Sequence, residues 1–265
     1  MRNGEEYGGQ PDAALYSKIH EKFADTIAFN SSLLRDNSAE RALREGRFLV
    51  FGRDMRQAYA FTYRYEPKYG SENVLPVDID FDFAYNCEPY HRMIGLIGEN
   101  GVGKTQLVSK LPIDLANQVL DTFWPKIPLF SKVIAVSYSV FDDFEIPESS
   151  SKINYLYCGL RIKKNGEKYN LTKPELKKRF FDSIEKVQKS NRFEHWCEII
   201  GNFFSKSTVE HWKIWDENTF NHKLDIRQIS SSLDRFSSGQ SIFVFILTEI
   251  LANIRYDSLI IFDEP

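Results

Sequence analysis

Residues 98 to 105 read Gly98-Glu-Asn-Gly-Val-Gly-Lys-Thr105 and match the phosphate-binding loop pattern G-x-x-x-x-G-K-[ST]. Glycine accepts backbone dihedrals that a Cβ forbids, so such a loop can curl around an anion with its N–H groups facing inward. In this pattern the lysine reaches the β- and γ-phosphates of a nucleotide, and the hydroxyl after it binds Mg²⁺. The residues predicted to bind nucleotide are Gly98, Glu99, Asn100, Gly101, Val102, Gly103, Lys104, Thr105 and Gln106, with Lys104 also catalytic and Thr105 also a metal ligand.

The segments on either side of the loop fit this interpretation. Arg92-Met-Ile-Gly-Leu-Ile97 is a short apolar run that predicts a buried strand, and residues 104–110 predict the start of a helix. A helix that begins at the loop adds the positive end of its dipole to the phosphate site. The alternative is a chance glycine-rich turn, which the Lys104-Thr105 pair after the last glycine makes the weaker interpretation.

The last residues, Ser258-Leu-Ile-Ile-Phe-Asp-Glu-Pro265, predict a second part of the same site. An unbroken apolar run of this length is typical of a strand covered on both faces in a parallel sheet. Asp263 follows at the carboxyl end of the strand, where open α/β sheets bind ligands, and is predicted to bind Mg²⁺. Glu264 is the candidate general base that activates the attacking water. Alone, an exposed Asp-Glu-Pro turn is the simpler interpretation, but the phosphate loop upstream favours the metal site.

A third motif, Phe236-Ser-Ser-Gly-Gln240, precedes the apolar segment 242–250. Ser237 and Ser238 are both good N-caps, so the pattern predicts a helix that begins here. A serine hydroxyl at a helix N-terminus is also well placed for an anion, because the helix dipole is positive at that end. An ordinary helix cap and a phosphate contact are both compatible with these residues.

With the three motifs in this order, the chain resembles the ATP-binding-cassette (ABC) superfamily, whose signature is usually written L-S-G-G-Q. It is most similar to the SMC-like branch, which includes double-strand-break-repair and bacterial defence ATPases. The segments Ser137-Tyr-Ser-Val-Phe-Asp142 and Tyr157-Cys-Gly-Leu-Arg161 resemble bacterial antiphage ATPases of the Septu and retron-associated kind. Phe236 replaces the leading leucine of the signature, and Ser238 replaces its first glycine. In this family the signature of one subunit contacts the γ-phosphate of ATP held by a second subunit. The resemblance implies this role for Ser237, Ser238, Gly239 and Gln240.

The resemblance covers residues 47–265 and implies an α/β fold, a P-loop NTPase of the ABC or SMC-head type. The family has a mostly parallel core sheet, an antiparallel sub-sheet before it and a helical lobe, here expected at residues 141–235. Residues 1–46 predict a helical extension outside that core. The family's elements beyond the catalytic glutamate have no counterpart before Pro265, so the C-terminal part of the fold is expected to be missing.

One element of the family pattern has no match. A glutamine normally ends the strand between the loop and the signature, and residues 132–139 predict that strand without supplying one. Ser137, Ser139 and Asp142 are the nearby polar residues that remain as candidates for part of its role.

Local patterns predict the remaining elements. Thr172-Lys-Pro-Glu175 is a capping box that begins a helix, and apolar residues at helical spacing predict another helix from Phe193. No sustained heptad pattern follows, which indicates a compact helical lobe and excludes a long coiled-coil arm within these residues. Further strands are predicted at residues 47–51, 58–63, 77–83 and 154–162.

The composition is ordinary for a globular protein, with 42% apolar and 27% charged residues. A net charge of −3 gives the whole chain no attraction to nucleic acid or membranes. The apolar segment 241–254 is shorter than the ~20 residues that span a membrane. Cysteines at positions 87, 158 and 197 have no metal or disulfide spacing and favour the reducing cytoplasm.

Two local features have alternative interpretations. Residues 161–192 contain more basic than acidic side chains, which indicates a contact surface for nucleic acid or an acidic partner, or the commoner solvated helix face. Trp212 and Trp215 are compatible with base stacking but more often pack in a core.

These inferences together predict a cytoplasmic, Mg²⁺-dependent ATPase whose heads close on ATP as a homodimer or higher oligomer. We expect it to control a nuclease or other effector, or to act on nucleic acid, in antiphage defence or DNA maintenance without a membrane partner. The residues of this sequence alone are expected to be inactive. Two alternatives stay open, the nucleotide-binding subunit of a membrane transporter and a non-hydrolysing ATP sensor or scaffold.

Overall fold

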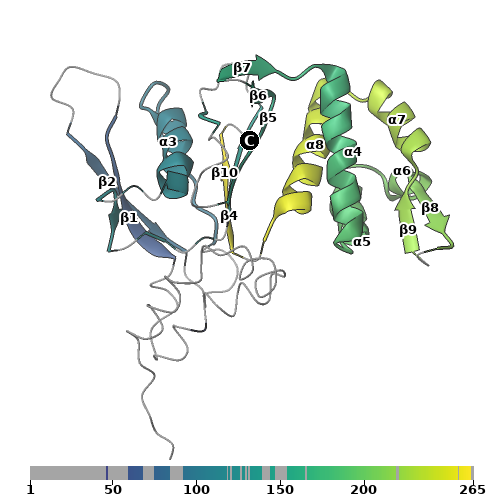
Figure 1. The fold of residues 1–265 in the computed structure, drawn as a ribbon, viewed down its shortest axis with the longest axis horizontal. Helices are drawn as coiled ribbons and strands as arrows, with labels where there is room; N and C mark the ends of the chain where they lie inside the picture. The colour runs from purple at the N-terminus through teal and green to yellow at the C-terminus, as the bar shows by residue number, and fades with distance from the viewer. Residues whose placement is uncertain are drawn as a thin grey trace, which may run out of the picture. The chain divides into compact units, whose positions relative to one another are not determined.

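The computed structural model describes residues 46, 59–67, 75–83, 92–117, 119, 121–125, 127–128, 130, 132–138, 144–146, 154–164, 166–218, 221–255 and 257–263 (Figure 1). Of the predicted extension at 1–46, the structure describes residue 46 alone. The predicted strand at 47–51, the candidates Ser139 and Asp142 and the candidate base Glu264 lie outside the described residues. The chain divides into two compact units, one of residues 1–98, 119–131 and 255–257 and the other of residues 99–118, 132–254 and 258–265.

The first unit contains a three-stranded antiparallel sheet of order β2-β1-β3. Its strands are β1 (Ala60–Tyr65), β2 (Val77–Asp82) and β3 (Phe123–Trp124), which confirms the two strands predicted at 58–63 and 77–83. β1 buries alternate aromatic side chains, and Phe61 stacks on Phe81 of β2 with ring centroids 5.1 Å apart. The opposite face of this pair is polar, because Arg64 and Asp78 form an exposed ion pair there.

The core of the second unit is a three-stranded parallel sheet of order β10-β4-β5 (Figure 1). Its strands are β4 (Lys132–Ser137), β5 (Asn154–Gly159) and β10 (Ser258–Phe262). β4 lies in the centre and is buried along its whole length, as expected of a parallel strand covered on both faces. The strand predicted at residues 132–139 and the strand predicted before Asp263 are therefore confirmed, whereas the one predicted at 154–162 ends earlier, at Gly159. The carboxyl ends of all three strands lie at the same edge of the sheet.

Two helices cover the faces of this sheet. Figure 1 shows α3 (Lys104–Asn117) on one side of the strands and α8 (Ser238–Asn253) on the other. Ile250 of α8 packs against Ile134 and Val136 of β4. A second face of α8 buries Val244 and Leu251 in the helical lobe. The sequence of α8 is apolar nearly all round because the helix is buried on both sides.

The helical lobe comprises α4 (Lys173–Lys189), α5 (Phe193–Gly201), α6 (Lys206–His211) and α7 (Ile226–Arg235). A hairpin of β8 (Lys213–Asp216) and β9 (Asn221–Leu224) joins α6 to α7. Glu175 closes the predicted capping box of α4, since its carboxylate accepts hydrogen bonds from the backbone N–H and hydroxyl of Thr172 at 2.9 and 2.7 Å. Trp196 and Trp212 are fully buried in the lobe core, so packing is the correct interpretation of Trp212.

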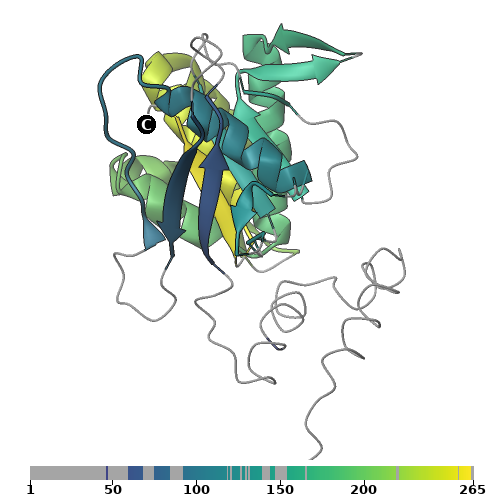
Figure 2. The same ribbon diagram turned by 90° about the vertical axis from the view of Figure 1, so that its left-hand side faces the viewer.

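The lobe begins later than the expected residue 141. Residues 154–159 form β5 and pair with β4 in the parallel sheet, where the successive side chains of Tyr157 and Cys158 are buried on opposite faces. A second hairpin, β6 (Arg161–Lys164) and β7 (Glu167–Asn170), continues from the carboxyl end of β5. Figure 2 shows this hairpin extending beyond the edge of the sheet. The first helix of the lobe then begins at Lys173.

The strand predicted at residues 92–97 is wrong. These residues form no strand and are exposed, and Ile97 is 99% exposed. The apolar run indicated burial, but a strand also needs a neighbour that accepts its backbone hydrogen bonds. None of the described strands pairs with this run.

Within the residues that the structure describes, no helix has the length and apolar character required to cross a membrane.

Candidate nucleotide site

The loop at residues 98–103 has the backbone conformation that its glycines allow. Gly101 and Gly103 have φ angles of 86° and 93°, in the left-handed region that other residues rarely adopt. The helix α3 begins directly after the second of these, and Leu107 N donates to Gly103 O at 2.9 Å to close its first turn. Lys104 folds back over the loop, with Nζ donating to Glu99 O at 2.8 Å. The loop therefore stands at a helix N-terminus, as the motif predicts.

The two predicted metal ligands are in contact. Thr105 Oγ1 donates a hydrogen bond to Asp263 Oδ1 at 3.2 Å, joining the first turn of α3 to the residue that follows β10. Asp263 N donates to Val136 O at 3.1 Å, so the parallel pairing continues one residue past the end of β10 and fixes Asp263 there. A hydroxyl and a carboxylate are hard oxygen ligands of the kind that Mg²⁺ binds, so these residues fit the expected metal.

The signature residues form the N-terminus of α8. Ser237 Oγ accepts from Gln240 N at 3.2 Å, and Ser237 N donates to Gln240 Oε1 at 3.0 Å, so the predicted helix cap is confirmed. Ser238, Gly239 and Gln240 are exposed. Phe236, the first residue of the motif, instead packs into the lobe and stacks on Phe204 with ring centroids 4.9 Å apart. The polar residues of the motif are thus available at the surface while its aromatic residue anchors them.

The signature and the phosphate loop of one chain do not face each other. α3 and α8 cover opposite faces of the parallel sheet, so their N-termini lie on different sides of it (Figure 1).

A buried ion pair that the sequence did not reveal holds α8 on the sheet. Arg179 of α4 forms an ion pair with Glu249 of α8, and its guanidinium also donates to Tyr157 O at 2.8 Å and Gly159 O at 3.1 Å. Burial raises the pKa of Glu249, although Arg179 opposes the shift. Burial also raises the pKa of the neighbouring Cys158 thiol well above its ordinary value, so this cysteine is neutral and structural. A single arginine therefore links two helices to the carboxyl end of β5.

The carboxyl ends of β4 and β5 are closely fitted. Tyr157 Oη donates to Ser137 O at 3.3 Å, across the two strands. Gly159 lies beside them, and a Cβ added there would overlap both Ser137 O and the Tyr157 phenol. Glycine is required at this position by close approach of neighbouring atoms.

Intramolecular partners account for much of the basic stretch at residues 161–192. Lys177 pairs with Asp234 at 2.5 Å, and Arg192 donates to the carbonyl oxygens of Leu251 and Ile254 at the end of α8, both at 2.9 Å. Lys177 thus joins α4 to α7 within the lobe, whereas Arg179 and Arg192 hold the lobe on α8. The structural interpretation is therefore favoured for this helical part of the stretch.

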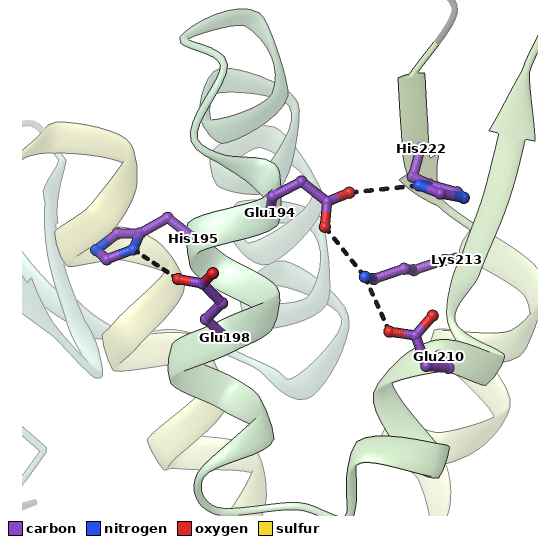
Figure 3. Close-up of polar contacts among 6 residues, drawn as sticks. All are labelled: Glu194, His195, Glu198, Glu210, Lys213 and His222. Atoms are coloured by element: carbon purple, nitrogen blue, oxygen red, sulfur yellow. Dashed lines mark hydrogen bonds and ion pairs between the residues drawn. The ribbon is translucent and has the colours of Figure 1, made fainter.

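The β8–β9 hairpin is held by a separate group of charges on the lobe surface (Figure 3). Lys213 binds Glu194 of α5 and Glu210 of α6 at 3.1 and 3.0 Å. Burial by itself lowers the pKa of Lys213, but hydrogen bonds to Glu210 and Glu194 outweigh it and raise the pKa. His222 approaches the other oxygen of Glu194 at 3.5 Å. No group of three histidine, cysteine or acidic side chains in the described part of the chain is arranged to hold a metal ion.

No family model matches the chain, and no solved structure matches it. Protein ea59 of Escherichia phage lambda is 24% identical over 270 residues, a match that covers 89% of this chain. The chain spans about half the length of that phage protein, since the match covers 50% of it.

Proposed function

We propose that this protein is a Mg²⁺-dependent ATPase of the ABC type, from the SMC-like branch, whose heads associate around ATP. The observation that carries the proposal is the hydrogen bond between Thr105 and Asp263. These residues come from two motifs that are 158 residues apart, and each motif alone predicts a metal ligand. If the two motifs were unrelated, we would not expect these oxygen atoms to be in contact next to a loop whose glycines have positive φ angles.

The chain's own residues have defined roles in this proposal. The loop N–H groups and the N-terminus of α3 bind the phosphates, and Lys104 moves from Glu99 O to the β- and γ-phosphates. Thr105 and Asp263 hold Mg²⁺, which neutralises charge on the phosphate oxygens when it is bound. Glu264, directly after Asp263 in the sequence, accepts the proton of the attacking water.

Dimerisation follows from the position of α8. The backbone N–H groups of the exposed residues Ser238 and Gly239, with the hydroxyls of Ser237 and Ser238, offer an anion site at the end of α8, on the side of the sheet opposite α3 of the same chain. In a face-to-face dimer this site receives the γ-phosphate bound by the second copy. ATP then acts as a clamp between heads, and its hydrolysis releases an effector or nucleic acid. A role in antiphage defence or DNA maintenance is the biological setting that we propose.

A non-hydrolysing ATP sensor is the second candidate. It is favoured by the end of β4, where Ser137 stands and the family pattern has a glutamine nearby. A sensor would bind ATP and dimerise without turnover, so it differs from the ATPase in one measurable property.

The first experiment is sedimentation of the full-length protein carrying Glu264→Gln, with and without Mg²⁺-ATP. We expect ATP to convert a smaller species into a dimer, because binding is retained while hydrolysis is slowed. Lys104→Ala is the matched control and is expected neither to bind ATP nor to dimerise. ATP binding without any change in mass would contradict the clamp. Turnover in Glu264→Gln equal to that of the unchanged protein would contradict the role of Glu264.

A further inference from the structure

The hydroxyl of Ser137 is a buried polar group without a partner. Ser137 is the last residue of β4 and is 1% exposed, and its Oγ has no hydrogen-bond partner among the residues that the structure describes. Leaving a buried hydroxyl unpaired costs free energy, and such groups are rare in native proteins without a functional reason. The backbone carbonyl of the same residue is bonded to Tyr157. The side chain therefore keeps hydrogen-bonding capacity that the fold itself does not use.

Strand register places Ser137 beside the predicted metal ligand. Phe262 of β10 is the partner of Val136, and Asp263 N donates to Val136 O, so Asp263 and Ser137 are neighbours across the strand ends. On the other side, Ser137 is the partner of Gly159. Ser137 thus lies between the metal-binding strand and the close-fitted end of β5.

The side chains of Ser137 and Asp263 lie on the same face of the sheet. Ile134 and Val136 of β4 and Ile260 of β10 pack toward α8. Because successive side chains of a strand alternate, Ser137 and Asp263 point to the opposite face, which α3 covers. The hydrogen bond from Thr105 of α3 to Asp263 agrees with this assignment. The unpaired hydroxyl therefore belongs to the same side of the sheet as Thr105 and Asp263.

We infer that Ser137 is a positioning residue of the nucleotide site and that its hydroxyl hydrogen-bonds a water molecule of the bound Mg²⁺-ATP complex. This inference rests on the proposed function. Mg²⁺ keeps several of its waters when it binds to proteins through one or two carboxylates or hydroxyls, and those waters need acceptors and donors from the protein. Ser137 supplies one such group next to Asp263, in a chain without the family's glutamine.

The test uses two buried hydroxyls that differ in one respect. Thr248 is also fully buried, but its Oγ1 accepts from Trp196 Nε1 at 2.8 Å and donates to Val244 O at 2.7 Å. Ser137→Ala removes an unpaired hydroxyl, and Thr248→Val removes a paired one. Each variant of the full-length protein is melted without nucleotide, with ATP and EDTA, and with Mg²⁺-ATP. Calorimetry gives the dissociation constant of each nucleotide form.

The two variants are expected to respond in opposite ways. Ser137→Ala should raise the melting temperature of the free protein by about 2–4 °C, because it removes an unpaired buried group. It should weaken Mg²⁺-ATP binding about tenfold and leave binding of metal-free ATP unchanged. Thr248→Val should lower the melting temperature of the free protein and leave the metal-dependent part of binding intact.

Two other results have distinct meanings. If Ser137→Ala retains the full metal-dependent gain in ATP affinity, the inference is wrong while the proposed ATPase stands. If the unchanged protein gains no stability from either form of ATP and behaves like Lys104→Ala, the proposed function fails and the inference fails with it.

Discussion

The helical lobe and the carboxyl edge of the parallel sheet differ in whether their buried side-chain polar groups have hydrogen-bond partners. In the lobe, the buried indole N–H of Trp196 donates to Thr248, and that of Trp212 donates to Ser232 Oγ at 2.9 Å. At the edge of the sheet, the buried hydroxyl of Ser137 has no such partner, and the loop before α3 is exposed. The lobe uses these polar groups to stabilise the fold, whereas we propose that the Ser137 hydroxyl and the loop at the edge serve a ligand. Substitutions in the lobe should therefore change stability, and substitutions at the edge should change binding.

The largest expected effect tests the lobe. Trp196→Ala should lower the free energy of unfolding by about 3–5 kcal/mol, because it opens a cavity and leaves the Thr248 hydroxyl without its donor. Denaturation in urea measures the loss. We expect a single transition, since α8 belongs to the lobe core and to the face of the sheet. Trp196→Phe, which keeps an aromatic ring, is the control and should lose less. A first transition that leaves ATP binding intact would show that the two regions unfold independently.

A smaller effect is expected at Gly159, where a substitution should change both stability and Mg²⁺-ATP affinity. Gly159→Ala should lower the free energy of unfolding by about 1–3 kcal/mol, because the new methyl group overlaps Ser137 O and the Tyr157 phenol. The strain falls at the edge of the sheet, so Mg²⁺-ATP affinity should also fall. Gly201→Ala is the matched control, since a Cβ there meets no atom within 4 Å. Calorimetry and urea denaturation on both variants separate the effects, and unchanged ATP affinity in Gly159→Ala would place the nucleotide away from this edge.

Two substitutions of Ser237 in the signature separate its effect on stability from its proposed role in dimerisation. Ser237→Ala should cost about 1 kcal/mol of stability, the usual value of a lost helix cap. Ser237→Asp keeps the cap, because aspartate is an equally good N-cap, but it places a negative charge where the γ-phosphate of the second copy is proposed to bind. We expect Ser237→Asp to fold normally, to bind ATP and to fail to dimerise in sedimentation. If Ser237→Asp still forms ATP-dependent dimers, the proposed phosphate contact is wrong and the motif serves as a helix cap alone.

Local chemistry is what the sequence predicted well. The glycines of the loop, the cap at Ser237 and the capping box at Thr172 depend on residues within one turn of each other, and each has the predicted geometry. The strands at 132–137 and 258–262 were also predictable, since a continuous apolar run in a parallel strand has few alternatives. The identity of the ATPase family, by contrast, remains a prediction.

Features that depend on tertiary pairing were missed. The apolar run at 92–97 looked like a strand, but apolarity does not supply a hydrogen-bonding neighbour. Arg179 looked like part of a basic surface, although its partner Glu249 lies on another helix. An acid inside the apolar helix α8 was the signal for a buried partner, because an unpaired buried charge is too costly. The proximity of Ser137 to Asp263 follows only from the register of the sheet.

The smallest expected effect concerns the ion pair that joins the lobe to the edge of the sheet. The pKa of Glu249 is raised above its ordinary value of 4.5, chiefly by burial, so the folded protein binds this proton more tightly than the unfolded chain does. Stability from the protonated carboxyl is therefore complete below about pH 4.5 and is lost as the pH rises through the raised pKa. Glu249→Gln mimics the protonated form and cannot titrate. Its stability relative to the unchanged protein should increase as the pH rises from about 4.5 through the raised pKa of Glu249 and then level off, as measured by urea denaturation across a pH series. If the unchanged protein instead gains on the variant as the pH rises, attraction to Arg179 outweighs burial, and the pair stabilises the junction as an ion pair.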